Sequence, residues 1–259
     1  MKVLITGGTG SIGSALARLI SDDVTIFSRN ESVQVEMKHN YSFKYIIGDV
    51  RDKHAIMKAC GGMDYVFHFA ALKHVEICEE QPMEAVKTNV IGTKNVINAC
   101  YKHGAKLVNM SSDKAINSGN VYGKTKSLSE DIVTEAGYLS IRSGNVLWSA
   151  GSVLPIWKQQ IALTNKINLT SKEMTRFFIH VDKLVNFIWN AKDKAGVLTV
   201  SMKSFYLYDI AIEFLKRYGD GETMINITGL RPGERLHEFR DAKTSSKDNI
   251  CTDLTYIFQ

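Results

Sequence analysis

KVLITGGTGSIG, residues 2–13, is a short apolar run followed by a glycine-rich segment, and ALARLI, residues 15–20, continues it with apolar side chains at helical spacing. The glycines Gly7, Gly10 and Gly13 form a GxxGxxG pattern between a predicted strand and a predicted helix, which is the context of a dinucleotide-binding fingerprint. Glycines allow a tight turn and let a pyrophosphate approach the N–H groups at the helix N-terminus. The stretch therefore predicts a Rossmann-like unit.

The same alternation of strand and helix continues along the chain. Further strands are predicted at 24–27 (VTIF), 43–48 (FKYIIG), 64–69 (DYVFHF), 105–110 (AKLVNM) and 138–142, and a long helix at 83–103. Alternating strands and helices predict an α/β fold with a doubly wound parallel sheet. Ligands of such a sheet bind outside the carboxyl ends of the strands, so the polar segments that follow the strands should meet at one edge.

Composition narrows the class of function. The chain has 259 residues, is 44% hydrophobic and 23% charged, and carries a net charge of +5. Basic residues are scattered, so nucleic-acid binding is not expected, whereas mild positive charge suits an anionic nucleotide. Four cysteines without metal-like spacing predict reduced thiols and no metal site. Because the chain has no signal peptide and no long apolar run, we expect a cytoplasmic protein that is not embedded in a membrane.

The second predicted strand ends in Ser28, Arg29, Asn30 and Glu31. Dinucleotide folds place the residue that reads the adenosine ribose here, where an acid suits NAD and an Arg suits the extra phosphate of NADP. Ser28 and Arg29 therefore favour NADP, while Glu31 keeps NAD as the alternative. After the third strand, Asp49 is a candidate partner for the adenine amino group.

The segment 111–126, SSDKAINSGNVYGKTK, contains the predicted catalytic groups Asp113, Lys114, Tyr122 and Lys126. Tyr122 and Lys126 are four residues apart, so they lie on one face of a helix that begins near Val121. A nearby ammonium favours the phenolate and lowers the pKa of Tyr122, which predicts a general base. Taken alone, such a pair is more often a solvated helix face.

Several motifs together resemble one family. They are GGTGSIG, GDVRD, the run beginning FAALKHVEICEE, SSDKAINSGNVYGKTK, SGNVLWSAGSVLP, MTRFFI and GLRPGERLHE. The chain resembles the extended short-chain dehydrogenase/reductase superfamily and, within it, the inverting UDP-N-acetylglucosamine 4,6-dehydratases of the polysaccharide biosynthesis protein family. The YxxxK pair indicates only the superfamily, whereas AALKHV, SSDKA and RPGERLHE are typical of the dehydratase branch.

The resemblance implies a mechanism. Tyr122, assisted by Lys126, would take the proton of the carbon 4 hydroxyl while a hydride passes to the nicotinamide. Lys114 would then remove the carbon 5 proton, and a protonated Asp113 would give a proton to the departing carbon 6 hydroxyl. As a base, Lys114 must be partly neutral. The expected partner is UDP-N-acetylglucosamine or a related UDP-sugar, and a homo-oligomer is expected.

The expected contacts follow from the pattern and the resemblance. Those with the cofactor are Gly7, Thr9, Gly10, Ser11, Ile12, Gly13, Ser28, Arg29, Asn30, Asp49, Val50, Ala70, Ala71, Lys73, Asn89, Tyr122, Lys126 and Val146. Those with the substrate are Lys73, Lys114, Asn145, Gly151, Ser152, Val153, Arg176 and Arg231, the two arginines binding its diphosphate. We expect a cofactor domain of residues 1–145 and 177–200, and a small substrate-binding region of residues 146–176 and 201–259.

The chain departs from the family pattern at three positions, where Ser143, Trp148 and Ala150 replace the expected Tyr, Gly and Arg. These changes fall in the segment that should contact the substrate. Two alternatives stay open: a retaining dehydratase or a UDP-sugar 4-epimerase on the same fold, and a catalytically silent NADP-binding sensor. Intact Tyr122, Lys126 and Lys114 argue against the sensor.

Overall fold

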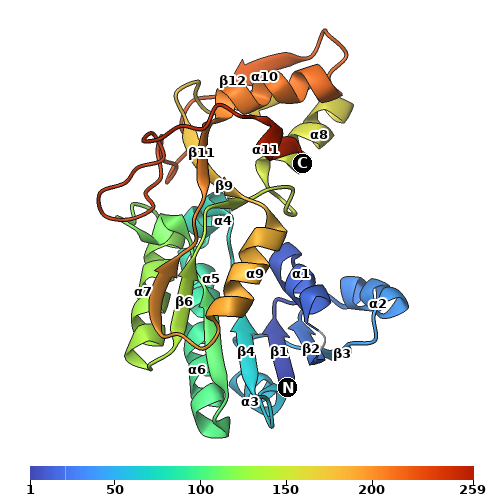
Figure 1. Ribbon diagram of the computed structural model, residues 1–259, viewed down its shortest axis with the longest axis vertical. Coiled ribbons are helices and arrows are strands. Elements are labelled where there is room, and N and C mark those ends of the chain that lie inside the picture. Colours follow the sequence, from blue (N-terminus) through green and yellow to red (C-terminus); the bar gives the residue numbers. More distant parts are fainter. Residues whose placement is uncertain (21) are drawn as a thin grey trace.

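The structure, a computed structural model, describes residues 1–20 and 22–259. Within these residues the central element is a seven-stranded parallel sheet with the order β10-β6-β5-β4-β1-β2-β3 (Figure 1). Its strands are β1 (Lys2–Thr6), β2 (Asp23–Ser28), β3 (Lys44–Ile47), β4 (Tyr65–His68), β5 (Lys106–Met110), β6 (Leu139–Arg142) and β10 (Gly196–Thr199). Strand order reverses between β1 and β4, and the predicted Rossmann-like fold is confirmed.

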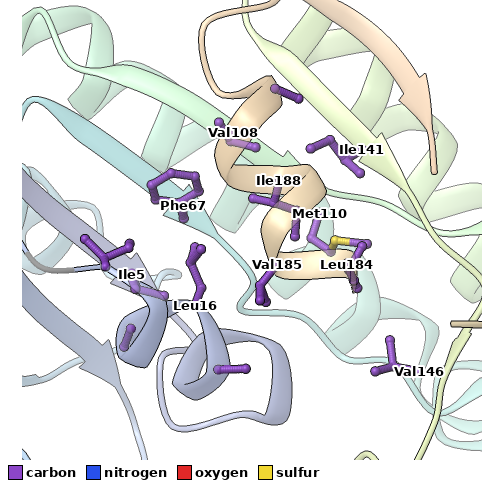
Figure 2. Packing of buried hydrophobic residues seen from close by; sticks show 14 of the residues in the cluster. Ile5, Leu16, Phe67, Val108, Met110, Ile141, Val146, Leu184, Val185 and Ile188 are labelled. Atoms are coloured by element: carbon purple, nitrogen blue, oxygen red, sulfur yellow. The ribbon is translucent and has the colours of Figure 1, made fainter. Parts of the chain in front are cut away.

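Side chains alternate between the two faces of each strand, and apolar side chains lie on both faces. Helices therefore cover both faces of the sheet. Val3 and Ile5 pack with α1 (Ser11–Leu19) and α9 (Val181–Ala191), as Figure 2 shows for Ile5 and its neighbours. Leu4 points to the opposite face and packs with α3 (Lys53–Ala59), α6 (Gly92–His103) and α7 (Val121–Glu135). Helix α2 (Glu31–Asn40) completes the first face through Met37.

The helical run between β4 and β5 is divided. It comprises α4 (Val75–Glu80), α5 (Pro82–Val86), the wider π-helical turn η1 (Lys87–Ile91) and α6. The long helix predicted at 83–103 is therefore continuous in space but contains a π turn. Asn89 lies in that turn and is 1% exposed.

A smaller region lies at the upper end of the molecule in Figure 1. It contains the three-stranded sheet β11-β9-β7, the pair β12-β8 and three helices. Their bounds are β7 (Asn145–Val146), α8 (Val153–Thr164), β8 (Lys166–Leu169), β9 (Thr175–Ile179), β11 (Lys203–Tyr206), α10 (Leu207–Tyr218), β12 (Met224–Ile227) and α11 (Thr255–Phe258). The domain boundary expected at residue 177 falls inside β9, which belongs to the sheet of this smaller region. The next strand of the large sheet along the chain is β10.

The smaller region has a core of its own, built on Trp157, Phe178, Phe205 and Phe214. Across residues 1–20 and 22–259, no helix combines the length and the apolar character needed to cross a lipid bilayer. Over the same residues, His, Cys, Asp and Glu side chains form no group of three or more that could hold a metal ion.

Candidate active site

A cleft of about 900 Å³ lies at the carboxyl ends of β1, β2, β4 and β5 and extends to the segment 143–152. Most of the predicted binding residues line it, from both halves of the chain. They are Gly7, Thr9, Gly10, Ser11, Ile12, Gly13, Ser28, Arg29, Asn30, Asp49, Val50, Ala70, Ala71, Lys73, Lys114, Tyr122, Lys126, Asn145, Val146, Gly151 and Ser152. The edge of the sheet thus gathers these segments as its topology requires.

The glycine turn leaves the N-terminus of α1 open to the cleft. Gly10 precedes the helix, no side chain caps it, and its first turn has no acidic residue. The free N–H groups of that turn therefore remain available to an anion. Gly7 has a φ of +67°, and a Cβ atom at Gly13 would lie 2.6 Å from the Gly7 carbonyl oxygen. This set of donors fits the pyrophosphate of a dinucleotide.

At the end of β2, Arg29 lies beside the cleft with 56% of its side chain exposed, 3.7 Å from the Asp49 carboxylate. The Ser28 hydroxyl is turned inward, where it accepts a hydrogen bond of 3.0 Å from Gln34. Arg51 binds Asp49 from the other side. The Arg29 guanidinium is therefore available to a group that enters this end of the cleft.

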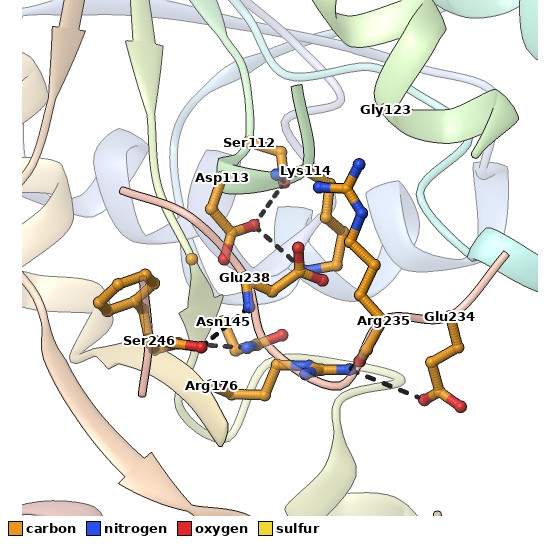
Figure 3. A network of polar contacts seen from close by, with 12 residues as sticks. Ser112, Asp113, Lys114, Gly123, Asn145, Arg176, Glu234, Arg235, Glu238 and Ser246 are labelled. Atoms are coloured by element: carbon orange, nitrogen blue, oxygen red, sulfur yellow. Dashed lines mark hydrogen bonds and ion pairs between the residues drawn. The ribbon is translucent and has the colours of Figure 1, made fainter. Parts of the chain in front are cut away.

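Strand β5 ends in the short 3-10 helix η2 (Asp113–Ala115), where the predicted acid and base are adjacent. Ser112 caps this turn, accepting from the Lys114 amide and donating to Asp113 Oδ1 at 3.0 Å. Lys114 Nζ lies 3.1 Å from Asp113 Oδ1 and 3.4 Å from Glu238 Oε1 (Figure 3). Lys114 lines the cleft, whereas Asp113 is fully buried behind it.

The charges around Lys114 decide its protonation. Burial lowers the pKa of Lys114, but the carboxylates of Asp113 and Glu238 outweigh burial and raise this pKa well above the ordinary lysine value. Arg176 opposes them and the Tyr122 phenol supports them. Lys114 is therefore an ammonium at neutral pH, in contrast to the partly neutral amine that the sequence led us to expect.

Tyr122 and Lys126 lie in the first two turns of α7, which begins after Asn120, whose side chain accepts from the Gly123 N–H at 2.7 Å. Both side chains are almost fully buried. Lys126 Nζ donates to the Met110 carbonyl oxygen at 2.8 Å, and burial lowers the pKa of Lys126 to about 8.

The pKa of Tyr122 differs from the sequence-based expectation. Burial raises it to about 12, and the chief opposing influence is the Lys114 ammonium, followed by a hydrogen bond with Ser112. The predicted lowering by Lys126 is wrong for this arrangement, because the Lys126 ammonium is directed to the Met110 carbonyl. The charge that acts on the phenol comes from Lys114.

Five predicted residues do not line the cleft: Asn89, Asp113, Val153, Arg176 and Arg231. Asn89 is buried and exchanges hydrogen bonds with the backbone of Leu72. It therefore supports the cleft wall from behind.

The two arginines predicted to bind a diphosphate are engaged within the protein. Arg176 donates to three backbone carbonyls, those of Thr175, Arg235 and Leu236. Arg231 is half exposed and pairs with Glu76 and Glu234. Val153 begins α8 and packs against the smaller core.

The cleft also contains residues that sequence reasoning did not select, among them Ser112, His74 and Ser149. Ser112 lies two residues after the end of β5, so the strand-edge rule could have found it. His74 contacts the segment 149–152, where a Cβ atom at Gly151 would lie 2.8 Å from the imidazole. That contact joins distant parts of the chain and has no local signal.

The segment around Ala150 bridges the two halves of the molecule. Its N–H donates to the Ser11 hydroxyl at 2.9 Å, and its carbonyl accepts from Lys73 Nζ at 2.5 Å. Ser11 belongs to the glycine turn and Lys73 follows β4. The predicted cofactor and substrate contacts are thus held together across the cleft by a single residue's backbone.

Known proteins are similar to this chain in sequence and in fold. The family described as "Polysaccharide biosynthesis protein" matches residues 3–258. UDP-N-acetylglucosamine 4,6-dehydratase (inverting) of Campylobacter jejuni is 35% identical, covering 100% of this chain and 80% of its own length. UDP-glucose 4-epimerase of Rickettsia canadensis is 37% identical, covering 91% of this chain and 76% of its own. The solved structure of Pen from Bacillus thuringiensis has a TM-score of 0.88 at 36% identity, covering 93% of this chain and 81% of that one.

Proposed function

The chain belongs to the polysaccharide biosynthesis protein family, and within it we propose that the protein is an NADP-dependent UDP-N-acetylglucosamine 4,6-dehydratase that inverts carbon 5. The observation that carries the proposal is one cleft lined by Lys114, Tyr122 and the glycine turn, with Asp113 in contact with Lys114 from behind the cleft wall. An epimerase needs a base at carbon 4, whereas elimination of water also needs an acid and a base near carbons 5 and 6. The name of the Campylobacter jejuni relative supports the same activity.

A nicotinamide cofactor bound at the glycine turn would supply reversible hydride transfer. The residues that would hold it are the first turn of α1 at its pyrophosphate and Arg29 at its adenosine end. NADP is preferred over NAD because Arg29 offers a guanidinium suited to a phosphate.

Tyr122 takes the proton of the carbon 4 hydroxyl. A phenol with a pKa of about 12 is a weak donor of its own proton at neutral pH, so its neighbours must stabilise the phenolate during turnover. Lys114 is the cation that acts on Tyr122, and Lys126 lies one helical turn away with a pKa near 8. The proton chemistry at carbon 4 is thereby coupled to that at carbon 5.

The Asp113–Lys114 contact can create the acid and the base together. Transfer of one proton from Lys114 Nζ to Asp113 Oδ1 over 3.1 Å breaks an N–H bond and forms an O–H bond, leaving a neutral amine facing the cleft and a carboxylic acid behind it. The amine removes the carbon 5 proton. Ser112, which contacts Asp113 at 3.0 Å and lines the cleft, connects the acid to the departing carbon 6 hydroxyl.

Mass spectrometry of UDP-N-acetylglucosamine incubated with the holoenzyme, with no added reductant, tests the proposal. A dehydratase produces a nucleotide sugar lighter by one water molecule. Lys114→Ala should abolish that product while cofactor binding remains. Product formation at the wild-type rate would remove Lys114 from the mechanism.

The second candidate is a UDP-sugar 4-epimerase, favoured by the name of the Rickettsia canadensis relative. Epimerisation changes no mass, so it is followed by separation of the gluco and galacto forms. An epimer that accumulates without loss of water, in wild type and in Lys114→Ala alike, would favour this candidate.

A further inference from the structure

Glu238 is a buried acid that the proposed chemistry does not use. It lies after the smaller region's last strand, its residue is 1% exposed, and Oε1 is 3.4 Å from Lys114 Nζ (Figure 3). It belongs to the motif GLRPGERLHE, in which only Arg231 was predicted to be a site residue. A carboxylate in contact with an ammonium that lines the cleft requires a further explanation.

The backbone holds Glu238 in place. Its N–H donates to the Ser246 hydroxyl at 2.8 Å, and its carbonyl accepts from the Ser246 N–H at 2.7 Å. Ser246 is bound in turn to Thr175 on β9 at 2.7 Å. These contacts position the main chain without using the carboxylate, so the side chain is free to act on Lys114.

Lys114 consequently has a carboxylate on each side. Asp113 approaches from its own turn and Glu238 from the C-terminal segment. Among the described residues, Asp113 Oδ2 and Glu238 Oε2 are buried side-chain oxygens with no hydrogen-bond partner. A buried carboxylate is costly unless a partner compensates it, and the partner that these two acids share is the Lys114 ammonium.

We propose that Glu238 is a positioning residue that holds Lys114 Nζ at the cleft wall and stabilises the ammonium that forms when Lys114 takes the carbon 5 proton. The inference rests on the proposed function. A carboxylate beside the base makes that base stronger, as a buried acid does for an imidazole in a hydrolase triad. The same carboxylate also makes the resting ammonium harder to deprotonate.

The charged groups that surround Lys114 determine whether replacing Glu238 raises or lowers the pKa of Lys114. Asp113 and Glu238 favour its charged form, Arg176 on β9 disfavours it, and Tyr122 on α7 adds a further favourable contribution. In Glu238→Gln one favourable charge is lost while Arg176 remains. Lys114 should therefore become neutral at a lower pH.

Two measurements test this. In protein labelled with ¹³C-lysine, the Lys114 Cε signal, assigned by its absence in Lys114→Arg, should titrate at a pH lower by about one unit or more in Glu238→Gln, the usual effect of a neighbouring charge. In the kcat profile of water elimination, the alkaline limb, where the Lys114–Asp113 pair loses the proton that it shares, should move to lower pH while the plateau falls several-fold. Glu238→Asp should restore part of both, which a merely structural defect would not.

Asp248→Asn is the matched control, since it removes a carboxylate from the same C-terminal hairpin and its amide oxygen can still accept from the Ser245 N–H. It should leave the Lys114 titration unchanged. An unchanged Lys114 titration in Glu238→Gln would overturn the inference. Because the NMR titration needs no turnover, it decides the inference even if the wild-type enzyme fails to eliminate water, which would refute the proposed function instead.

Discussion

Lys126 illustrates how a site residue can oppose stability. Its side chain is 5% exposed and its pKa is about 8, below the ordinary value of 10.5, because burial disfavours the charged form. Below pH 8 both the folded and the unfolded protein carry the proton, and the folded protein bears the full cost of the buried charge. This cost disappears as pH rises from 8 toward 10.5.

Lys126→Met should therefore stabilise the protein at pH 7, by about 2 kcal/mol after allowing for the lost hydrogen bond to Met110. The gain should shrink toward pH 10, and activity should be lost. Urea unfolding of wild type and variant at both pH values measures it. Lys216→Met, on the exposed face of α10, is the control and should change little. A variant less stable than wild type at pH 7 would contradict the pKa of Lys126.

Arg29 is the residue that we expect to determine the preference between NADP and NAD. Arg29→Ala should weaken NADP about 10- to 100-fold, the value of a charge-assisted hydrogen bond to a phosphate, and change NAD much less. Calorimetry with each cofactor gives both constants. Arg217→Ala, on the distant helix α10, should affect neither. Equal losses for the two cofactors at Arg29 would reverse the assignment to NADP.

The chemistry of these residues was predictable only in part. Lys114, Tyr122 and Lys126 stand in one segment, so the sequence brings them together. Their protonation depends on tertiary contacts, because Lys126 is bound by the end of a neighbouring strand and Lys114 by a glutamate 124 residues later in the chain. No local sequence pattern predicts with which carbonyl or carboxylate a lysine will form a hydrogen bond or an ion pair.

At the scale of elements, the glycine turn depends on close packing of backbone. A Cβ atom at Gly13 would lie 2.6 Å from the Gly7 oxygen and 2.7 Å from the Gly8 Cα atom, whereas at Gly10 the nearest atom would be 3.2 Å away. Backbone atoms cannot yield as a flexible side chain can. Gly13 should therefore tolerate a Cβ atom less well than Gly10, although both glycines belong to one motif.

Gly13→Ala should destabilise the protein by about 2 kcal/mol, the usual cost of overpacking, and abolish dinucleotide binding. Gly10→Ala should cost clearly less and serves as the matched control. Thermal unfolding and cofactor titration of both variants measure these effects. Equal stability of the two variants would show that the glycine turn is looser than the distances indicate.

Six strands of the large sheet were predicted because each is an apolar run bounded by polar residues, whereas its seventh strand, β10, was not predicted. The π turn in the helical run was not, since apolar spacing does not reveal a widened turn. Asn89 was predicted to contact the cofactor, but its partner Leu72 lies in a loop that only the fold brings near. The sequence therefore predicted that Asn89 contacts a ligand, whereas in the structure Asn89 supports the wall of the cleft.

At the scale of the whole molecule, Trp148 joins the cleft to the C-terminal end. It adopts a φ of +56°, which glycine adopts without strain, and its indole N–H donates to the Ile257 carbonyl at 3.3 Å. Its ring also packs against Phe214 and Tyr218 on α10. Trp148, one of the three residues that depart from the expected pattern, thus connects helix α11 to the segment 143–152.

Trp148→Gly should relieve the strain of the positive φ at this position but remove the hydrogen bond that holds helix α11. We expect faster hydrogen exchange in residues 251–258 and a higher KM for the UDP-sugar, with kcat less affected. Exchange measured by mass spectrometry compares the variant with wild type. Unchanged exchange in that peptide would mean that α11 is held by the rest of its core.

The activity that we propose for this cleft is elimination of water from a UDP-sugar with inversion at carbon 5. Proton NMR of UDP-N-acetylglucosamine with the holoenzyme in deuterated water tests it most directly, by following the carbon 6 methyl signal and the configuration and deuterium content of carbon 5. The account predicts a new methyl signal and solvent deuterium at an inverted carbon 5. A methyl signal with retained configuration would contradict the inversion, and conversion to the galacto epimer without a methyl signal would contradict the dehydratase itself.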